Sequence, residues 1–208
     1  MISAPINIYP NRMGRIVLQA MEEILGHVGV NSILKLAHFP NYIDQNPATN
    51  LDLKFPFEHF SSLQTAFERA YGHRAGRGLA LRVGRACLKY SLREFSPELG
   101  MTDMAFRLLP LPARLKVGSE ALADLFNRFT DQHIILEADK KQLYWHIERC
   151  PLWRERQADS PCCILIVGFL QEALSWFSRG KTFLVEEKNS NAGEDRLCTI
   201  VINKTPMS

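Results

Sequence analysis

The stretch that decides the fold is residues 163–203, CILIVGFLQEALSWFSRGKTFLVEEKNSNAGEDRLCTIVIN. It begins with an apolar run typical of a helix that ends at Gly180. It then changes to two short segments typical of strands, 182–188 and 198–203, which a polar turn rich in asparagine separates. The stretch therefore predicts a helix followed by an antiparallel hairpin.

A second hairpin is predicted directly upstream. Residues 133–138 and 142–148 alternate in character, and Leu143, Trp145 and Ile147 share one face of the second segment. The polar residues 139–141 supply the turn. Two hairpins give about four antiparallel strands.

Apolar residues at helical spacing precede these hairpins. We expect helices over residues 11–25, 57–70, 77–95 and 115–129, and a short helix that begins after residue 31. Residues 39–56 contain three prolines and three asparagines, which is typical of a loop or lid. The order of elements predicts one α+β domain over 1–208, a mostly antiparallel sheet packed against several helices.

Charge and composition exclude several classes of protein. Net charge is +3, with 25 basic and 22 acidic residues, so the sequence gives no signal for nucleic-acid binding. No apolar run reaches the roughly 20 residues that cross a bilayer, and the first residues lack the pattern of a secretory signal. An odd count of five cysteines favours reduced thiols, so we expect a cytoplasmic protein.

The common catalytic motifs are missing from the sequence. It contains no nucleophile elbow, no phosphate-binding loop and no zinc-protease helix. Gly76, Gly78 and Gly84 follow no strand, so close helix packing is the favoured explanation for them. Arg82, Arg85, Lys89 and Arg93 are interpreted as a solvated helix face. We predict no catalytic residue.

Five segments carry a resemblance to a known family. They are GRGLALRVGRACLKYSLREF (76–95), LFNRFTD (125–131), YWHIERCP (144–151), PCCILIVGFLQEAL (161–174) and FLVEEKNSNAGEDRLCTIVI (183–202). Together they resemble the 4-vinyl-reductase-type (hydrocarbon-binding) domain. Residues 57–203 are the part best matched, and 1–56 form N-terminal helices and the lid-like loop.

The resemblance implies both a fold and a class of function. It implies the fold shared by TRAPP subunits and, more distantly, by haem-based nitric-oxide sensors, with formation of homodimers. Members bind small hydrophobic or aromatic molecules, as in the sensory domains of phenol-responsive activators. A stand-alone sensor or carrier would signal or assemble through a protein partner.

We predict a ligand pocket between the sheet and the helices. The phase of the strands and the faces of the helices point to five aromatic residues as ligand contacts: Tyr90, Phe126, Trp145, Phe169 and Phe183. The alternative for each is ordinary core packing.

Two other functions stay open. One is an enzyme or accessory factor in bacteriochlorophyll or tetrapyrrole biosynthesis, although the sequence shows neither a dinucleotide fingerprint nor a complete iron–sulfur cysteine set. The other is an assembly scaffold that needs no ligand.

The resemblance also implies a zinc site. The family's metal ligands fall on Cys163, Glu187, Ser190 and Cys198, and the serine is a departure, because its hydroxyl is a poor substitute for a thiolate. Cys162 is a possible substitute, but adjacent thiols at a helix start point in different directions. Relatives carry a further thiol shortly after Cys150, where this chain has Trp153. The sequence favours a site that has lost its metal, and bound zinc stays the alternative.

A haem site is disfavoured. Tyr90, Ser91 and Arg93 resemble the Tyr-x-Ser-x-Arg motif of haem nitric-oxide sensors, but their spacing differs from it. No histidine stands out as an axial ligand.

Overall fold

A computed structural model of the chain describes residues 8–100, 104–148, 150, 163–188 and 198–207. The helices are α1 (Asn11–Leu36), α2 (Glu58–Tyr71), α3 (His73–Glu94), α4 (Ser96–Leu99), α5 (Met104–Leu108), α6 (Leu111–Phe129) and α7 (Ile164–Ser178), with a 3-10 turn η1 (Pro40–Tyr42). The strands are β1 (Ile8–Pro10), β2 (Leu53–Pro56), β3 (Ile134–Ala138), β4 (Gln142–Ile147), β5 (Val185–Lys188) and β6 (Cys198–Asn203).

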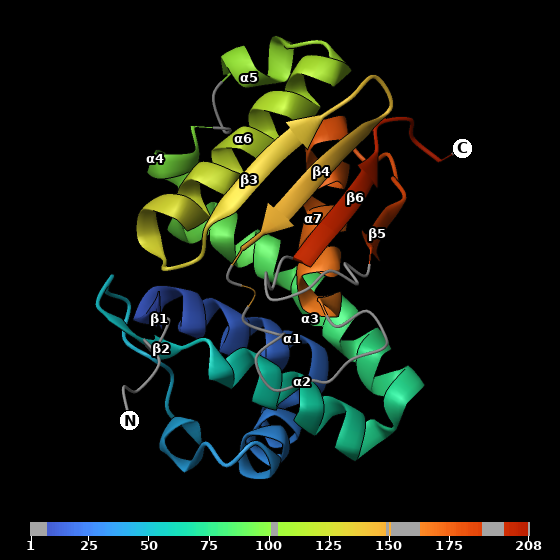
Figure 1. Ribbon diagram of the computed structural model, residues 1–208. Helices are drawn as coiled ribbons and strands as arrows, with labels where there is room; N and C mark the ends of the chain where they lie inside the picture. Colours follow the sequence, from blue (N-terminus) through green and yellow to red (C-terminus); the bar gives the residue numbers. More distant parts are fainter. Residues whose placement is uncertain (1–7, 101–103, 149, 151–162, 189–197, 208) are drawn as a thin grey trace, which may run out of the picture.

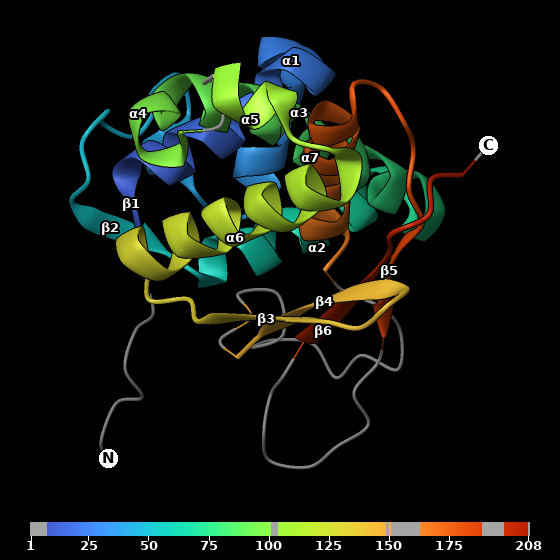
Figure 2. The same ribbon diagram turned by 90° about the horizontal axis from the view of Figure 1, so that it is seen from above.

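The larger sheet has four antiparallel strands in the order β3-β4-β6-β5. Figure 2 shows this sheet as one layer, with the helices on one side of it. Leu143, Trp145 and Ile147 are buried, while the residues between them are partly exposed, as the alternation predicted. The predicted α+β class and sheet of about four strands are confirmed.

Helices α3 and α7 pack closely across the middle of the molecule (Figure 1). A Cβ atom at Gly84 would run into the backbone carbonyl of Leu165, and one at Gly168 would run into that of Leu81. Glycine therefore lets the two backbones touch, and the predicted packing role of Gly84 is confirmed.

The N-terminal region differs from the sequence expectation in two ways. The predicted end of the first helix at residue 25 is present as a kink at Gly26, where φ is 70°. Helical structure resumes directly after this glycine and not after Asn31. Residues 39–56 contain η1 and β2, and β2 pairs antiparallel with β1 to form a two-stranded sheet. Strands this short show no clear alternation, so the sequence did not reveal them.

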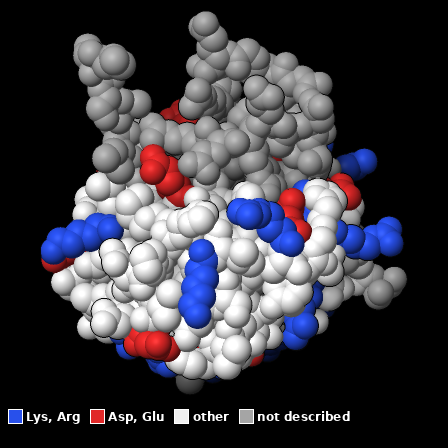
Figure 3. Space-filling model, turned by 90° about the horizontal axis from the view of Figure 1, so that it is seen from below, with Lys and Arg blue, Asp and Glu red and all other residues white. Residues whose placement is uncertain are grey.

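Charged side chains are mixed on the surface. Figure 3 shows basic and acidic groups interspersed on the face seen from below. On α3, Lys89 pairs with Glu23 and Arg85 donates hydrogen bonds to Gln171, in agreement with a solvated helix face. Within the described residues, no helix is both long and apolar enough to cross a membrane.

Candidate functional site

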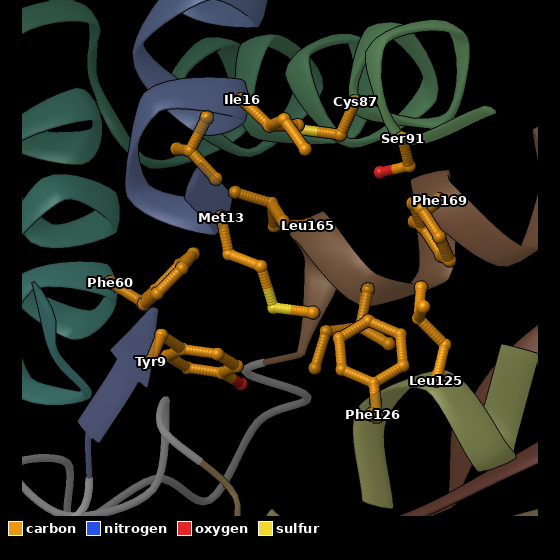
Figure 4. Close-up of a pocket in the computed structure, with 12 residues that line it drawn as sticks. Tyr9, Met13, Ile16, Phe60, Cys87, Ser91, Leu125, Phe126, Leu165 and Phe169 are labelled. Atoms are coloured by element: carbon orange, nitrogen blue, oxygen red, sulfur yellow. The ribbon is translucent and has the colours of Figure 1, made fainter. Parts of the chain in front are cut away.

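An apolar cavity of about 70 Å³ lies among the helices. Side chains from β1, α1, α2, α3, α6 and α7 converge on it (Figure 4). They are Tyr9, Met13, Ile16, Val17, Phe60, Cys87, Ser91, Leu125, Phe126, Leu165, Ile166 and Phe169. None of these belongs to the four-stranded sheet or to residues 39–56, so the cavity lies among the helices and not between the helices and that sheet.

Three polar groups border this apolar space. The Ser91 hydroxyl points toward its interior in Figure 4. The Tyr9 hydroxyl donates a hydrogen bond of 2.7 Å to the buried Gln132 Oε1, which fixes the tyrosine ring. Burial raises the pKa of the Cys87 thiol to about 12, so this group stays neutral.

Two of the five predicted aromatic residues line the cavity. Phe126 and Phe169 lie edge to face, with ring centroids 5.9 Å apart. Trp145 packs behind Phe126 at 6.4 Å and is fully buried in the core. Tyr90 instead donates a hydrogen bond to Glu23 at the surface, and Phe183 borders a separate hollow.

The sequence analysis missed the contribution of the N-terminal region to the cavity. Tyr9, Met13 and Ile16 come from β1 and the start of α1. The helical spacing of Met13 and Ile16 identified a buried face, but it could not show which part of that face is left unfilled.

Three buried thiols form a second site. The Cys163 Sγ lies 3.0 Å from the Cys150 Sγ and 2.8 Å from the Cys198 Sγ, and all three sulfur atoms lie within 4.8 Å of one another. Strand pairing explains the convergence: Ile147 at the end of β4 lies opposite Cys198, so the chain leaving β4 brings Cys150 to the start of β6.

Glu187 joins this thiol cluster from β5. One carboxylate oxygen, Oε1, lies 3.8 Å from the Cys198 Sγ. The other, Oε2, accepts a 2.6 Å hydrogen bond from the backbone N–H of Cys163, directly before α7. The positive end of a helix stabilises such a negative group.

The structure brings together the predicted residues Cys163, Glu187 and Cys198, and it adds Cys150. The sequence analysis did not include Cys150 in this site. It had assigned Cys150 to a separate thiol motif of the family, in which this chain has Trp153 at the position of the second thiol. Ser190, Cys162 and Trp153 lie outside the described residues.

The cluster has the donors of a closed zinc site. Structural zinc is held tetrahedrally by thiolates at roughly 2.3 Å and carboxylate oxygens at roughly 2.0–2.2 Å. The pKa of the Cys198 thiol lies far above its ordinary value. Its hydrogen bond with Cys150 is the largest cause, and burial and the charge of Glu187 act in the same direction. Without a cation the Cys198 thiol therefore keeps its proton, and a metal ion would displace it.

The cluster and the cavity share the start of α7. Cys163 directly precedes α7, and Leu165, Ile166 and Phe169 line the cavity. Burial raises the pKa of Tyr9 well above its ordinary value, and the charges that Cys150 and Cys163 would carry add to this. Tyr9 thus borders the cavity and lies near the thiols.

Several solved structures that are similar to this chain are H-NOX domains. An Fe(II) unliganded H-NOX protein from K. algicida matches with a TM-score of 0.62 at 9% identity, over 96% of this chain and 97% of that one. A variant of the Tt H-NOX protein matches with a TM-score of 0.61 at 13% identity, over 96% and 97%. An oxygen-binding H-NOX domain related to soluble guanylate cyclases matches with a TM-score of 0.56 at 14% identity, over 92% and 93%.

Identity this low shows the shared fold alone. The sequence matches no protein-family model and no curated protein. The predicted relation to haem-based nitric-oxide sensors is therefore confirmed for the fold, whereas the 4-vinyl-reductase-type family stays a prediction.

The cavity does not fit haem. Among the described residues, no histidine lines the cavity. The Tyr9 hydroxyl is already hydrogen-bonded, and the raised pKa of Cys87 opposes a thiolate ligand. Its volume of about 70 Å³ is also about half of the roughly 150 Å³ that accommodates benzene. A macrocycle of four pyrrole rings requires far more space.

Proposed function

We propose that this protein binds a small apolar molecule in the cavity among α1, α3, α6 and α7. The observation that carries the proposal is an interior apolar space bordered by few polar groups, which is how small-molecule sites are generally built. The ligand's apolar part would contact Phe126 and Phe169, and a single polar group would face the Ser91 hydroxyl. The protein would act as a stand-alone sensor, carrier or accessory domain, in keeping with its resemblance to hydrocarbon-binding domains.

The size of the cavity favours this function over the tetrapyrrole alternative. At about 70 Å³ the space takes a molecule smaller than benzene without rearrangement. A larger ligand requires flexible side chains such as Met13 to move. A scaffold without ligand would have no use for this interior space, since voids of this kind lower stability.

Xenon is a suitable first probe because it enters apolar cavities without needing hydrogen bonds. In methyl-labelled protein we expect xenon to shift the NMR signals of Ile16, Leu125 and Leu165, and not that of the exposed Ile135 on β3. Native mass spectrometry of protein purified from its own host would then identify the natural ligand.

A pair of variants at Cys87 tests the location of binding. Cys87→Leu adds apolar volume to the cavity and should weaken xenon binding, whereas Cys87→Ala enlarges the cavity and should strengthen it. Equal binding by both variants would show that xenon occupies another place, and the proposed function would then fail.

A metal-bound form is a second proposal, which the convergence of three buried thiols supports. Zinc would be held by Cys150, Cys163, Cys198 and Glu187, and it would supply a structural crosslink. The four residues come from the segment after β4, the start of α7, β5 and β6. The crosslink would fix the start of the helix that lines the cavity.

A further inference from the structure

A second hollow lies where α5, the first turn of α6 and the end of α7 meet, at the upper end of the molecule in Figure 1. Its volume of about 490 Å³ lies within the range of ordinary ligand pockets. Within the described part of the chain, it shares no lining residue with the apolar cavity. An inference about this hollow is therefore independent of the proposed function.

Three arginines and one glutamate line the hollow: Arg107, Arg114, Arg179 and Glu172. In the part of the chain that the structure describes, none of the four forms an ion pair. Arg179 donates one hydrogen bond of 2.8 Å to the backbone carbonyl of Arg107, which ties the end of α7 to α5. The lining thus carries an excess of positive charge.

Arg114 has an unmet need for a hydrogen-bond acceptor. Its side chain lines the hollow, and its Nε is buried without a hydrogen-bond partner among the described residues. A buried donor on a charged group is costly to leave unpaired. The guanidinium fork matches the two oxygens of a carboxylate, so a bound anion would meet this need.

Two aromatic rings border the same hollow. Phe106 and Trp176 are stacked, with centroids 5.9 Å apart and an interplanar angle of 19°. Phe106 is buried beneath, whereas Trp176 is only partly buried. A flat apolar group can therefore pack on the tryptophan while an attached anion reaches the arginines.

We infer that this hollow binds a planar organic anion, namely an aromatic or conjugated carboxylate. The carboxylate pairs with Arg114 and the neighbouring arginines, and the ring system packs against Trp176. Glu172 repels the anion and so sets a preference for ligands of a single negative charge. A small molecule is favoured over a peptide because the aromatic stack and the arginines border one hollow of about 490 Å³.

Calorimetric titration with 2-naphthoate tests the inference on the full chain, with the neutral 2-naphthylmethanol as the matched ligand. We expect the carboxylate to bind at least tenfold more tightly than the alcohol. Arg114→Gln should weaken naphthoate binding by about tenfold, and Arg114→Lys should weaken it less because the charge is kept. Arg69→Gln, at an exposed position on α2, is the control and should leave binding unchanged.

Glu172→Gln provides a test in the opposite direction that does not remove a buried donor. It should strengthen naphthoate binding severalfold. This test remains informative even if Arg114→Gln fails to fold. Equal binding of acid and alcohol would overturn the inference, as would an unchanged affinity in both Arg114→Gln and Glu172→Gln.

An acidic amphipathic peptide is the competing occupant, since Met104 and Leu108 on α5 are 77% and 79% exposed. If such a peptide binds and naphthoate does not, the hollow is a protein-docking surface and the inference is wrong.

Discussion

Gly84 on α3 and Gly168 on α7 are reciprocal partners at the crossing of their helices. Each lies against the backbone carbonyl of the residue three positions before the other glycine, Leu165 and Leu81 respectively. This contact joins α3, which carries Cys87 and Ser91, to α7, which carries Leu165 and Phe169. The glycine pair therefore sets the spacing of two walls of the cavity.

Gly84→Ala should destabilise the protein by about 3 kcal/mol, because the added methyl group must push two helix backbones apart. The matched control is Gly78→Ala on the same helix, where an added Cβ meets no atom within 4 Å. Alanine there should stabilise by roughly 0.5–1 kcal/mol, since it lowers the backbone entropy of the unfolded chain. Urea denaturation measures both, and equal effects of the two changes would contradict the crossing geometry.

Cys150→Ser should remove most of the bound zinc if Cys150 completes the thiol cluster. Metal analysis of protein purified without chelator should find about one zinc per wild-type chain. Stripping the metal should lower Tm by about 10 °C, as expected for a loss of roughly 3–5 kcal/mol in a chain of this length. Cys87→Ala is the control, because this thiol lies in the cavity and should leave zinc content unchanged. Full zinc content in Cys150→Ser would exclude Cys150 as a ligand.

Tyr9→Phe should destabilise the protein by about 1–3 kcal/mol, because it leaves the buried Gln132 Oε1 without the 2.7 Å hydrogen bond that it now accepts. Adding Gln132→Met should recover part of the loss, since both polar partners are then gone. Thermal or chemical unfolding of the two single variants and the double variant gives the coupling energy. Strictly additive effects would show that the hydrogen bond contributes nothing.

Stability should fall as the pH is lowered from about 6.5 to about 4, and His59 should contribute to this fall. Burial lowers the pKa of His59 from its ordinary value of 6.5 to about 4. Its Nδ1 is buried without a hydrogen-bond partner among the described residues, against the rings of Phe39 and Phe55. Between these two values the unfolded chain binds a proton that the folded chain does not, so acid favours unfolding.

Replacement by phenylalanine isolates the contribution of His59. The difference in unfolding free energy between wild type and His59→Phe should be constant above pH 6.5 and should shift in favour of the variant as the pH falls toward 4. Denaturation curves over this range provide the measurement. A difference that does not change with pH would mean that His59 has the same pKa in the folded and the unfolded chain.

Much of the fold was readable from the sequence because it depends on local periodicity. The alternation around Trp145 gave both the strand and its buried face, and the predicted bounds of 198–203 are those of β6. Helix periodicity located the main helices to within a few residues at most ends. The strands β1 and β2 were missed, because a strand of three or four residues has no period to detect.

The sequence by itself determined the main helices and the two hairpins, and its resemblance to a known family pointed to Cys163, Glu187 and Cys198 as members of one site. Only the tertiary structure decided that Cys150 joins them, because that contact depends on the pairing of Ile147 with Cys198 across two strands. It also decided that the cavity lies among the helices, where Phe126 and Phe169 meet the start of α1. Which face of a helix or strand is buried is a local property of its own sequence. The space left unfilled between several elements depends instead on how all of them pack.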